Sequence, residues 1–211
     1  MPPASSAHAL KTHDVHLRTR RNGGLRAALG LACVLLLAAS CGGGDKTERE
    51  LAREALNRGL AEQRAGDVEA AGEAYRDVLR HDPDNAFAFY NLGVLAQADN
   101  RLADAEENYR AALNTDPTFA RALYNLATVR YRLGAKLESV DLYQQVTELE
   151  PQNASAHLNL AFSLRELGKE EEAGEEFGTA VQLDPRLVSR VPDDVVLNLG
   201  GGNDQGRVED G

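Results

Sequence analysis

Asparagine recurs along this sequence at a constant spacing of 34 residues, as Asn57, Asn91, Asn125 and Asn159. Each side-chain amide carries both a hydrogen-bond donor and an acceptor. A row of such amides on one surface can bind the main chain of an extended peptide whatever the sequence of that peptide. The chemistry these residues predict is the binding of a protein partner. The alternative is that they serve only to order the helices that carry them.

Residues suited to catalysis are scarce. After residue 41 the sequence contains two histidines, His81 and His157, and we expect His157 to be a partly buried packing residue rather than a base. No phosphate-binding glycine loop, nucleophile elbow or paired-histidine metal motif occurs. Two cysteines, Cys33 and Cys41, are too few for a disulfide framework or a cysteine zinc site. The sequence therefore predicts no catalytic residue, no metal site and no cofactor.

The elements that must position the asparagines repeat with the same period. Prolines Pro83, Pro117, Pro151 and Pro185 are also 34 residues apart, which divides the chain into units 52–85, 86–119, 120–153 and 154–187. In every unit the eighth and twentieth positions are small and the twenty-fourth is aromatic. The eighth position holds Gly59, Gly93, Ala127 and Ala161, the twentieth Ala71, Ala105, Ser139 and Ala173, and the twenty-fourth Tyr75, Tyr109, Tyr143 and Phe177.

These positions have a physical meaning. Two antiparallel helices of about fourteen residues approach closely only where side chains are small, and an aromatic ring fills the wider gap beside them. The fifteenth position holds residues that tolerate a left-handed backbone, where the first helix must stop. These are Gly66, Asn100, Gly134 and Gly168. Each proline then ends the second helix.

With these columns, residues 52–187 resemble the tetratricopeptide repeat (TPR), whose Leu-Gly, Ala, aromatic and Pro pattern recurs every 34 residues. The resemblance implies an all-α fold, an α-solenoid of four tandem helix-turn-helix repeats wound as a right-handed superhelix. In that fold the first helix of each repeat lines a concave groove. Positions two, five, six, nine, twelve and thirteen of each repeat then face the groove, so the asparagines at position six would lie in it.

The groove positions beside the asparagines are apolar or basic. Arg53 and Arg64 stand at two of them, and Leu56 occupies the place where the chaperone-tail clamp of some TPR domains needs a lysine. We therefore expect a partner segment that is extended and acidic or carboxylate-bearing, and not a chaperone tail. Besides the four asparagines, the expected peptide-binding residues are Tyr90, Tyr124, Leu158, Phe162, Arg121, Arg132 and Arg165.

The first forty residues have the order of an export signal. Arginines precede the apolar run 27–40, whose length of about 21 Å as a helix is short of the roughly 30 Å hydrocarbon core. The residues Leu37-Ala38-Ala39-Ser40-Cys41 resemble a bacterial lipobox. The resemblance implies that residues 1–40 are cleaved as a lipoprotein signal peptide and that Cys41 is lipidated. Gly42 then favours the outer membrane if there is one. The alternative is an ordinary signal peptide, with Cys41 a chance thiol.

The ends of the repeat region depart from the pattern as terminal units should. Residues 41–51 are expected to be a lipidated tether and the start of the first helix, and Arg58 with Glu62 forms an i,i+4 pair suited to water. Residues 188–211 are expected to be a short cap and a flexible acidic tail. The stretch Val195-Val196-Leu197-Asn198-Leu199 could open a further helix or be extended.

The charge balance disfavours one class of function. With 23 Lys and Arg against 33 Asp and Glu, the net charge is −10, which disfavours nucleic-acid binding. The sequence predicts a non-enzymatic TPR lipoprotein that scaffolds a cell-envelope complex, resembling lipoproteins of pilus, secretion or outer-membrane assembly. The alternatives are a periplasmic accessory or carrier that holds a small ligand or glycan, and a structural repeat that only self-associates.

Overall fold

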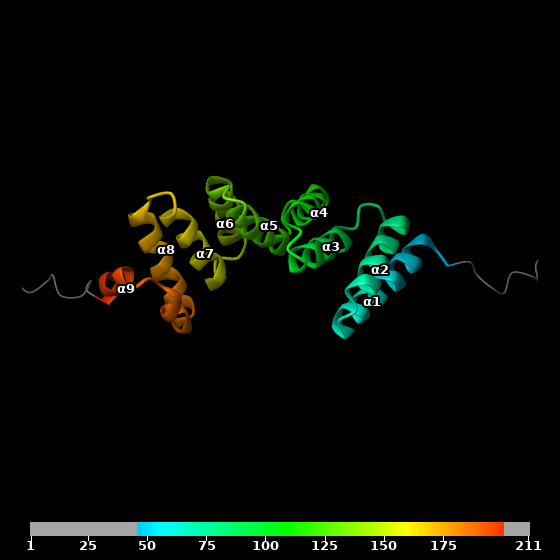
Figure 1. Ribbon diagram of the computed structural model, residues 1–211, viewed down its shortest axis with the longest axis horizontal. Helices are drawn as coiled ribbons and strands as arrows, with labels where there is room; N and C mark the ends of the chain where they lie inside the picture. Colours follow the sequence, from blue (N-terminus) through cyan, green and yellow to red (C-terminus); the bar gives the residue numbers. More distant parts are fainter. Residues whose placement is uncertain (1–45, 201–211) are drawn as a thin grey trace, which may run out of the picture. The chain divides into compact units, whose positions relative to one another are not determined.

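The computed structural model describes residues 46–200 (Figure 1). The predicted signal peptide, the lipidation site Cys41 and the tail beyond residue 200 lie outside the described residues. Within residues 46–200 every element is helical and no strand occurs. The helices are α1 (Glu48–Ala65), α2 (Val68–His81), α3 (Ala86–Ala98), α4 (Leu102–Thr115), α5 (Ala120–Arg132), α6 (Lys136–Leu149), α7 (Ala154–Arg165), α8 (Glu170–Leu183), the 3-10 helix Pro185–Arg190 and α9 (Asp193–Gly200).

Consecutive helices pair as hairpins, α1 with α2, α3 with α4, α5 with α6 and α7 with α8, and the second helix of each hairpin packs on the first helix of the next. This order confirms the predicted all-α solenoid of four helical repeats. The first helix begins before its repeat unit, because Thr47 caps it: the Thr47 hydroxyl accepts from the Glu50 N–H, and the Glu50 carboxylate accepts from the Thr47 N–H.

The turns between paired helices have the predicted left-handed residue. Gly66, Gly134 and Gly168 have φ values of 84°, 84° and 74°, and Asn100 has a φ of 59°. Glycine adopts these angles without strain because it has no Cβ atom, and asparagine is one of the few other residues that tolerate them, which is why the two recur there. The second helices end just before the C-cap acids Asp82, Asp116, Glu150 and Asp184, each of which precedes a repeat proline.

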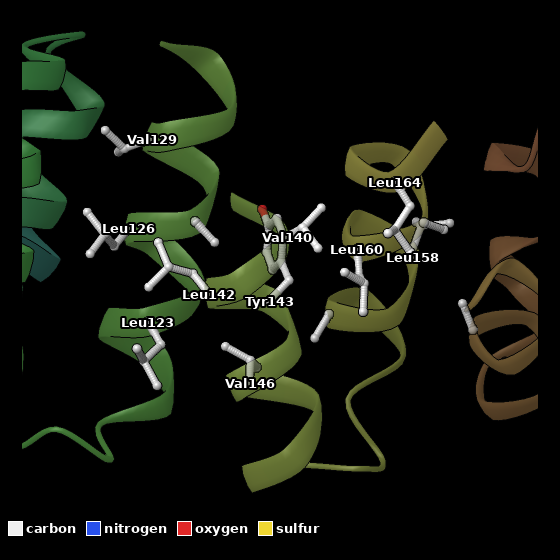
Figure 2. Packing of buried hydrophobic residues seen from close by; sticks show 14 of the residues in the cluster. Leu123, Leu126, Val129, Val140, Leu142, Tyr143, Val146, Leu158, Leu160 and Leu164 are labelled. Atoms are coloured by element: carbon white, nitrogen blue, oxygen red, sulfur yellow. The ribbon is translucent and has the colours of Figure 1, made fainter. Parts of the chain in front are cut away.

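The core of each hairpin is built around the predicted aromatic ring. Tyr75, Tyr109 and Phe177 are fully buried and Tyr143 nearly so. In the second hairpin the ring of Tyr109 lies so close to Gly93 that a Cβ atom there would come within 2.6 Å of it. Figure 2 shows apolar side chains of α5, α6 and α7 meeting in one layer. That layer belongs to a cluster running from α3 to α9, whereas smaller separate clusters join α1 and α2 to α3.

At the N-terminal end of the repeat region the structure differs from the prediction, and at the C-terminal end it decides between the two alternatives. Arg58 does not pair with Glu62 but donates to the Asp77 carboxylate of α2, 2.5 Å away, because that carboxylate lies across the hairpin. At the other end Val195 lies in a helix, α9, rather than in an extended segment. Val191 is buried and Val195 and Val196 pack against the main core cluster, so the C-terminal segment covers apolar surface of the last repeat.

Candidate partner-binding face

The asparagine ladder lies on the first helices α1, α3, α5 and α7, but most of its donors have partners inside the protein. Asn91 is buried and donates to the Phe87 carbonyl at 2.7 Å. Asn125 donates to the hydroxyls of Tyr90, at 3.5 Å, and Tyr109, at 3.3 Å. Only Asn57, in the first repeat, is exposed.

A regular link between repeats follows from these contacts. Like the bond from Asn125 to Tyr90, the bond from Asn159 to the Tyr124 hydroxyl, at 2.6 Å, joins residues 35 positions apart. An asparagine at position six thus donates to a tyrosine at position five of the preceding repeat. The side-chain amide oxygens of Asn125 and Asn159 accept no hydrogen bond from any other described residue. The ladder therefore orders neighbouring first helices and still offers acceptors, so the prediction that it binds a peptide stays a prediction.

Arg121 on α5 is held by aromatic rings. Its guanidinium carbon lies 5.3 Å from the centroid of the Phe119 ring, 5.5 Å from that of Tyr90 and 5.9 Å from that of Phe87. At these distances the negative faces of the rings attract the cation. No carboxylate among residues 46–200 pairs with Arg121. Its charge is consequently oriented, exposed and not neutralised by the protein.

A cleft of about 320 Å³ opens beside Arg121. Its walls come from α3, α5 and the loop that precedes α7. One wall residue is acidic, Glu150, but its carboxylate accepts from the Asn153 side chain at 2.9 Å. The cleft is lined by Tyr90, Arg121, Tyr124, Asn125, Glu150, Asn153 and Ser155. Tyrosine rings, amides and one unpaired guanidinium can bind a carboxylate or a peptide main chain.

The other predicted arginines are placed differently from Arg121. Arg132 donates to the Asn100 side-chain oxygen at 2.6 Å. Arg165 pairs with Asp194 at 2.8 Å and with Glu170 at 3.7 Å. Because Asp194 belongs to α9, the C-terminal segment neutralises the charge that the sequence assigned to a partner. Arg165 is thus occupied by the cap of the repeat region.

The two apolar residues of α7 that were predicted to contact a partner are both shielded from solvent, one fully and one in part. Leu158 is fully buried, with no exposed surface, so the prediction that it contacts a partner was wrong. Leu158 is instead part of the main core cluster, which also contains Val191 of the C-terminal segment. Phe162 is half-buried and packs edge-on against the Phe177 ring, with centroids 5.0 Å apart.

One basic residue of this face was missed by the sequence analysis. Burial raises the pKa of the Tyr124 phenol, and the positive charge of Arg190 is the largest effect that opposes the rise. Arg190 therefore lies near Tyr124, although it follows the four repeats. Arg190 is exposed and makes no ion pair with another described residue. No repeat column contains it, so the period could not reveal it.

Histidines and acids form no candidate metal site in the described part of the chain. His157 is half-buried, as predicted, with Nδ1 2.6 Å from the Glu176 carboxylate and Nε2 3.1 Å from the Pro151 carbonyl. Among residues 46–200 there is no group of three or more His, Cys, Asp or Glu that could hold a metal ion. In the same range no helix combines the length and the apolar character needed to cross a membrane.

Comparisons with known proteins agree with this geometry. A family model of the tetratricopeptide repeat matches residues 56–118 and 90–145, and a second model of the same repeat matches residues 142–175. A crystal structure of MamA protein is 25% identical with a TM-score of 0.61, over 64% of this chain and 74% of that one. Another crystal structure of MamA is 26% identical with a TM-score of 0.57, over 60% and 74% of the two chains.

A MamA fragment from Desulfovibrio magneticus RS-1, residue 41 to its end, shows the same fold at 21% identity. Its TM-score is 0.58, over 64% of this chain and 76% of that one. No curated protein matches the sequence. The likeness to solved structures therefore concerns the helical repeat and its architecture.

Proposed function

The chain belongs to the tetratricopeptide-repeat family, and on that basis we propose that it is a lipid-anchored scaffold in the assembly of a bacterial cell-envelope complex. Its repeats make it a protein-interaction scaffold. The pilus, secretion or outer-membrane machinery is the setting we propose, with the anchor at Cys41. The partner contributes an extended, acidic segment that binds along the first helices, and no chemical step takes place.

The proposal that the partner segment is acidic rests on a single observation, the unpaired positive charge of Arg121. The protein as a whole is acidic, yet this guanidinium faces a cleft and has no carboxylate partner among the described residues. A charge that is already oriented by three rings loses little side-chain entropy on binding. Arg190 adds a second unpaired positive charge near Tyr124. The acceptors of Asn125 and Asn159 would then receive main-chain N–H groups of the bound segment.

The groove is tested with a twelve-residue fluorescein-labelled peptide of alternating aspartate and serine, titrated with the full chain and followed by fluorescence anisotropy. We expect Arg121→Gln to weaken binding at least fivefold, because the variant keeps a flexible polar side chain but loses the positive charge. Arg49→Gln is the matched control, since Arg49 is exposed in the first turn of α1 and makes no ion pair with another described residue. Equal affinity of the two variants would remove the groove from the proposal.

The anchor is tested separately by Cys41→Ser. We expect the wild-type chain in the membrane fraction of the producing bacterium and the variant in the soluble fraction, because two or more acyl chains hold a protein stably at a membrane. Metabolic labelling with a radioactive fatty acid should mark the wild type only. Unchanged fractionation of Cys41→Ser, or labelling of that variant, would contradict lipid anchoring and leave the groove result intact.

A further inference from the structure

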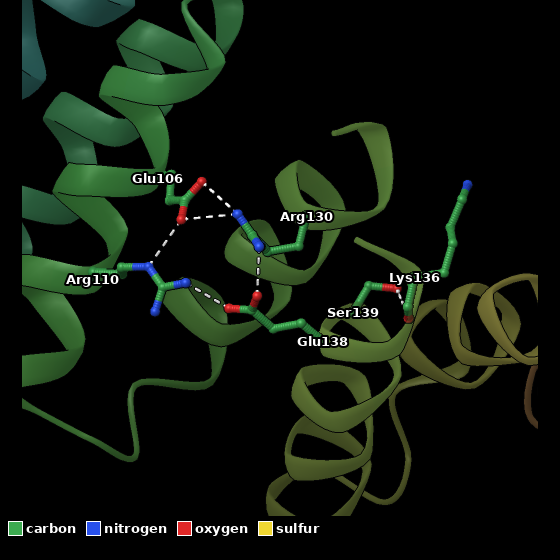
Figure 3. A network of polar contacts seen from close by, with 6 residues as sticks. All are labelled: Glu106, Arg110, Arg130, Lys136, Glu138 and Ser139. Atoms are coloured by element: carbon green, nitrogen blue, oxygen red, sulfur yellow. Dashed lines mark hydrogen bonds and ion pairs between the residues drawn. The ribbon is translucent and has the colours of Figure 1, made fainter. Parts of the chain in front are cut away.

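The three junctions between consecutive repeats are built on equivalent residues but filled in three different ways. Four repeat positions meet at each junction: twenty-one and twenty-five of one repeat, and eleven and nineteen of the next. Between the second and third repeats these positions form a network of ion pairs (Figure 3). Its members are Glu106 and Arg110 of α4, Arg130 of α5 and Glu138 of α6.

The network fills its junction with charged side chains that pair with one another, and of their buried polar atoms only the Nε of Arg130 has no hydrogen-bond partner among the described residues. The Arg130 guanidinium donates to both oxygens of Glu106, at 2.9 and 3.0 Å, and pairs with Glu138 at 2.7 Å. Between the third and fourth repeats the same two central positions hold Val140 and Leu164, both buried in the main core cluster. Both junctions are therefore occupied, one by ions and one by apolar groups.

Between the first and second repeats the two central positions hold Gly72 and Ala96. These residues are too small to replace Glu106 and Arg130, and a cavity of about 610 Å³ lies there between α2, α3 and α4. A Cβ atom added to Gly72 would have its nearest neighbours at 3.6 Å, in Arg76, and 3.7 Å, in Leu95. Those are ordinary van der Waals distances to two side chains, so a Cβ atom would fit at this position and no close backbone approach requires the glycine.

The cavity has an apolar floor and an acidic margin. Leu92, Leu95 and Ala96 of α3 line it together with Val68, which is 42% exposed. The lining also contains five acids against two arginines. The acids are Glu69, Glu73, Asp99, Asp104 and Glu107, and the arginines are Arg76 and Arg101.

Only part of this charge is neutralised within the protein. Arg101 pairs with Asp104 at 2.5 Å and with Asp99 at 3.4 Å. Glu69, Glu73 and Glu107 make no ion pair with another residue of the described chain. The negative charge that remains therefore surrounds an apolar opening, and it has the opposite sign to that of Arg121 on the first-helix face.

We propose that the cavity between α2 and α4 is a second docking site, which takes an aliphatic side chain of a partner protein flanked by lysine or arginine residues. The aliphatic group packs against Val68 and Leu92, above the buried Leu95 and Ala96. The flanking cations meet Glu69, Glu73 and Glu107. Apolar anchors with charged surroundings are a common arrangement at protein interfaces. The site is distinct from the proposed groove, because its lining shares no residue with the cleft beside Arg121 and it selects a basic rather than an acidic segment.

The test uses the full chain and a fluorescein-labelled peptide with one leucine between two pairs of lysines, followed by fluorescence anisotropy. The double substitution Gly72→Glu with Ala96→Arg installs the residues of the next junction, keeps the net charge and should weaken binding at least tenfold. Gly174→Glu is the matched control, because Gly174 has the same repeat position in α8 and open space around it. It should bind the peptide as the wild type does.

A second double variant tests the same site in case the first variant fails to fold. Glu69→Lys with Glu73→Lys changes two exposed residues, leaves the cavity open and should also reduce binding at least tenfold. Arg121→Gln should leave it unchanged, which separates this site from the groove. Undiminished binding by either double variant overturns the proposal. So does equal affinity for a peptide in which glycine replaces the leucine, or absence of binding to the wild-type chain.

Discussion

At the scale of single residues, the size of the eighth repeat position sets how closely the two helices of a hairpin approach. Gly59 and Gly93 lie against the rings of Tyr75 and Tyr109, each at a distance that leaves no room for a Cβ atom. Both rings are fully buried, and the Tyr109 hydroxyl donates to the Gln97 side chain at 2.8 Å. The ring cannot move aside without losing packing and a hydrogen bond.

Gly93→Ala should therefore destabilise the protein by about 1–3 kcal/mol, although alanine favours helices, because overpacking outweighs propensity. Urea unfolding followed by circular dichroism measures the change in the free energy of unfolding. Gly174→Ala, in open space on α8, should be neutral or slightly stabilising. A Gly93→Ala variant as stable as the wild type would show that the Tyr109 ring is not fixed.

At the scale of elements, a network of ion pairs joins α4, α5 and α6 at one edge of the apolar core that the three helices share (Figure 3). Burial opposes ionisation of Glu106, but hydrogen bonds from Arg130 and Arg110 outweigh it and hold the pKa of this carboxyl below its ordinary value of 4.5. A carboxyl whose pKa is lower in the folded state stabilises the fold above its ordinary pKa. That stabilisation is lost as the pH falls through the folded-state pKa.

Glu106→Gln should lower the free energy of unfolding by about 1–3 kcal/mol at pH 7, because the two arginines lose their charged acceptor. The difference from the wild type should shrink as the pH falls below 4.5, where the wild-type carboxyl also takes up its proton. Urea titrations at a series of pH values measure this. Glu107→Gln, exposed and without an ion pair in the described chain, should change stability little at any pH. A difference that persists at low pH would contradict the assignment.

At the scale of the whole repeat region, the apolar core is continuous through the last three repeats but not into the first. One cluster joins the second, third and fourth repeats to the C-terminal segment, while the first repeat is attached through small clusters beside the cavity. In a repeat protein stability is a sum of unit and neighbour contributions, so a poorly filled junction weakens the unit it joins. The first hairpin should then open without the others.

We expect the amides in the middle of α1 and α2 to exchange with deuterium on the order of tenfold faster than those of α5 and α6. Hydrogen exchange followed by mass spectrometry of peptic fragments measures both regions in one experiment. Equal protection of the two hairpins would mean that the cavity does not weaken the first junction.

Much of the fold could be predicted because it depends on contacts that are short in sequence. Each hairpin needs a small residue, an aromatic ring, a left-handed turn and a proline within 34 residues, and all of these stand in the sequence at fixed positions. The sequence also located the asparagines and Arg121 on the first helices. Those inferences need only the helical period, which any stretch of the chain reveals by itself.

The tertiary structure decided which of the side chains predicted to bind a partner are accessible to one. Asn159 has a tyrosine partner 35 residues away, Arg165 is neutralised by Asp194, and Leu158 is buried in the main core cluster. Neighbours from other repeats likewise supply the aromatic rings around Arg121. They also border the cavity beside Gly72 and Ala96. A repeat pattern fixes how each unit folds, but the pairing and burial of a side chain depend on what the adjacent unit presents, and that is settled only when the units stack.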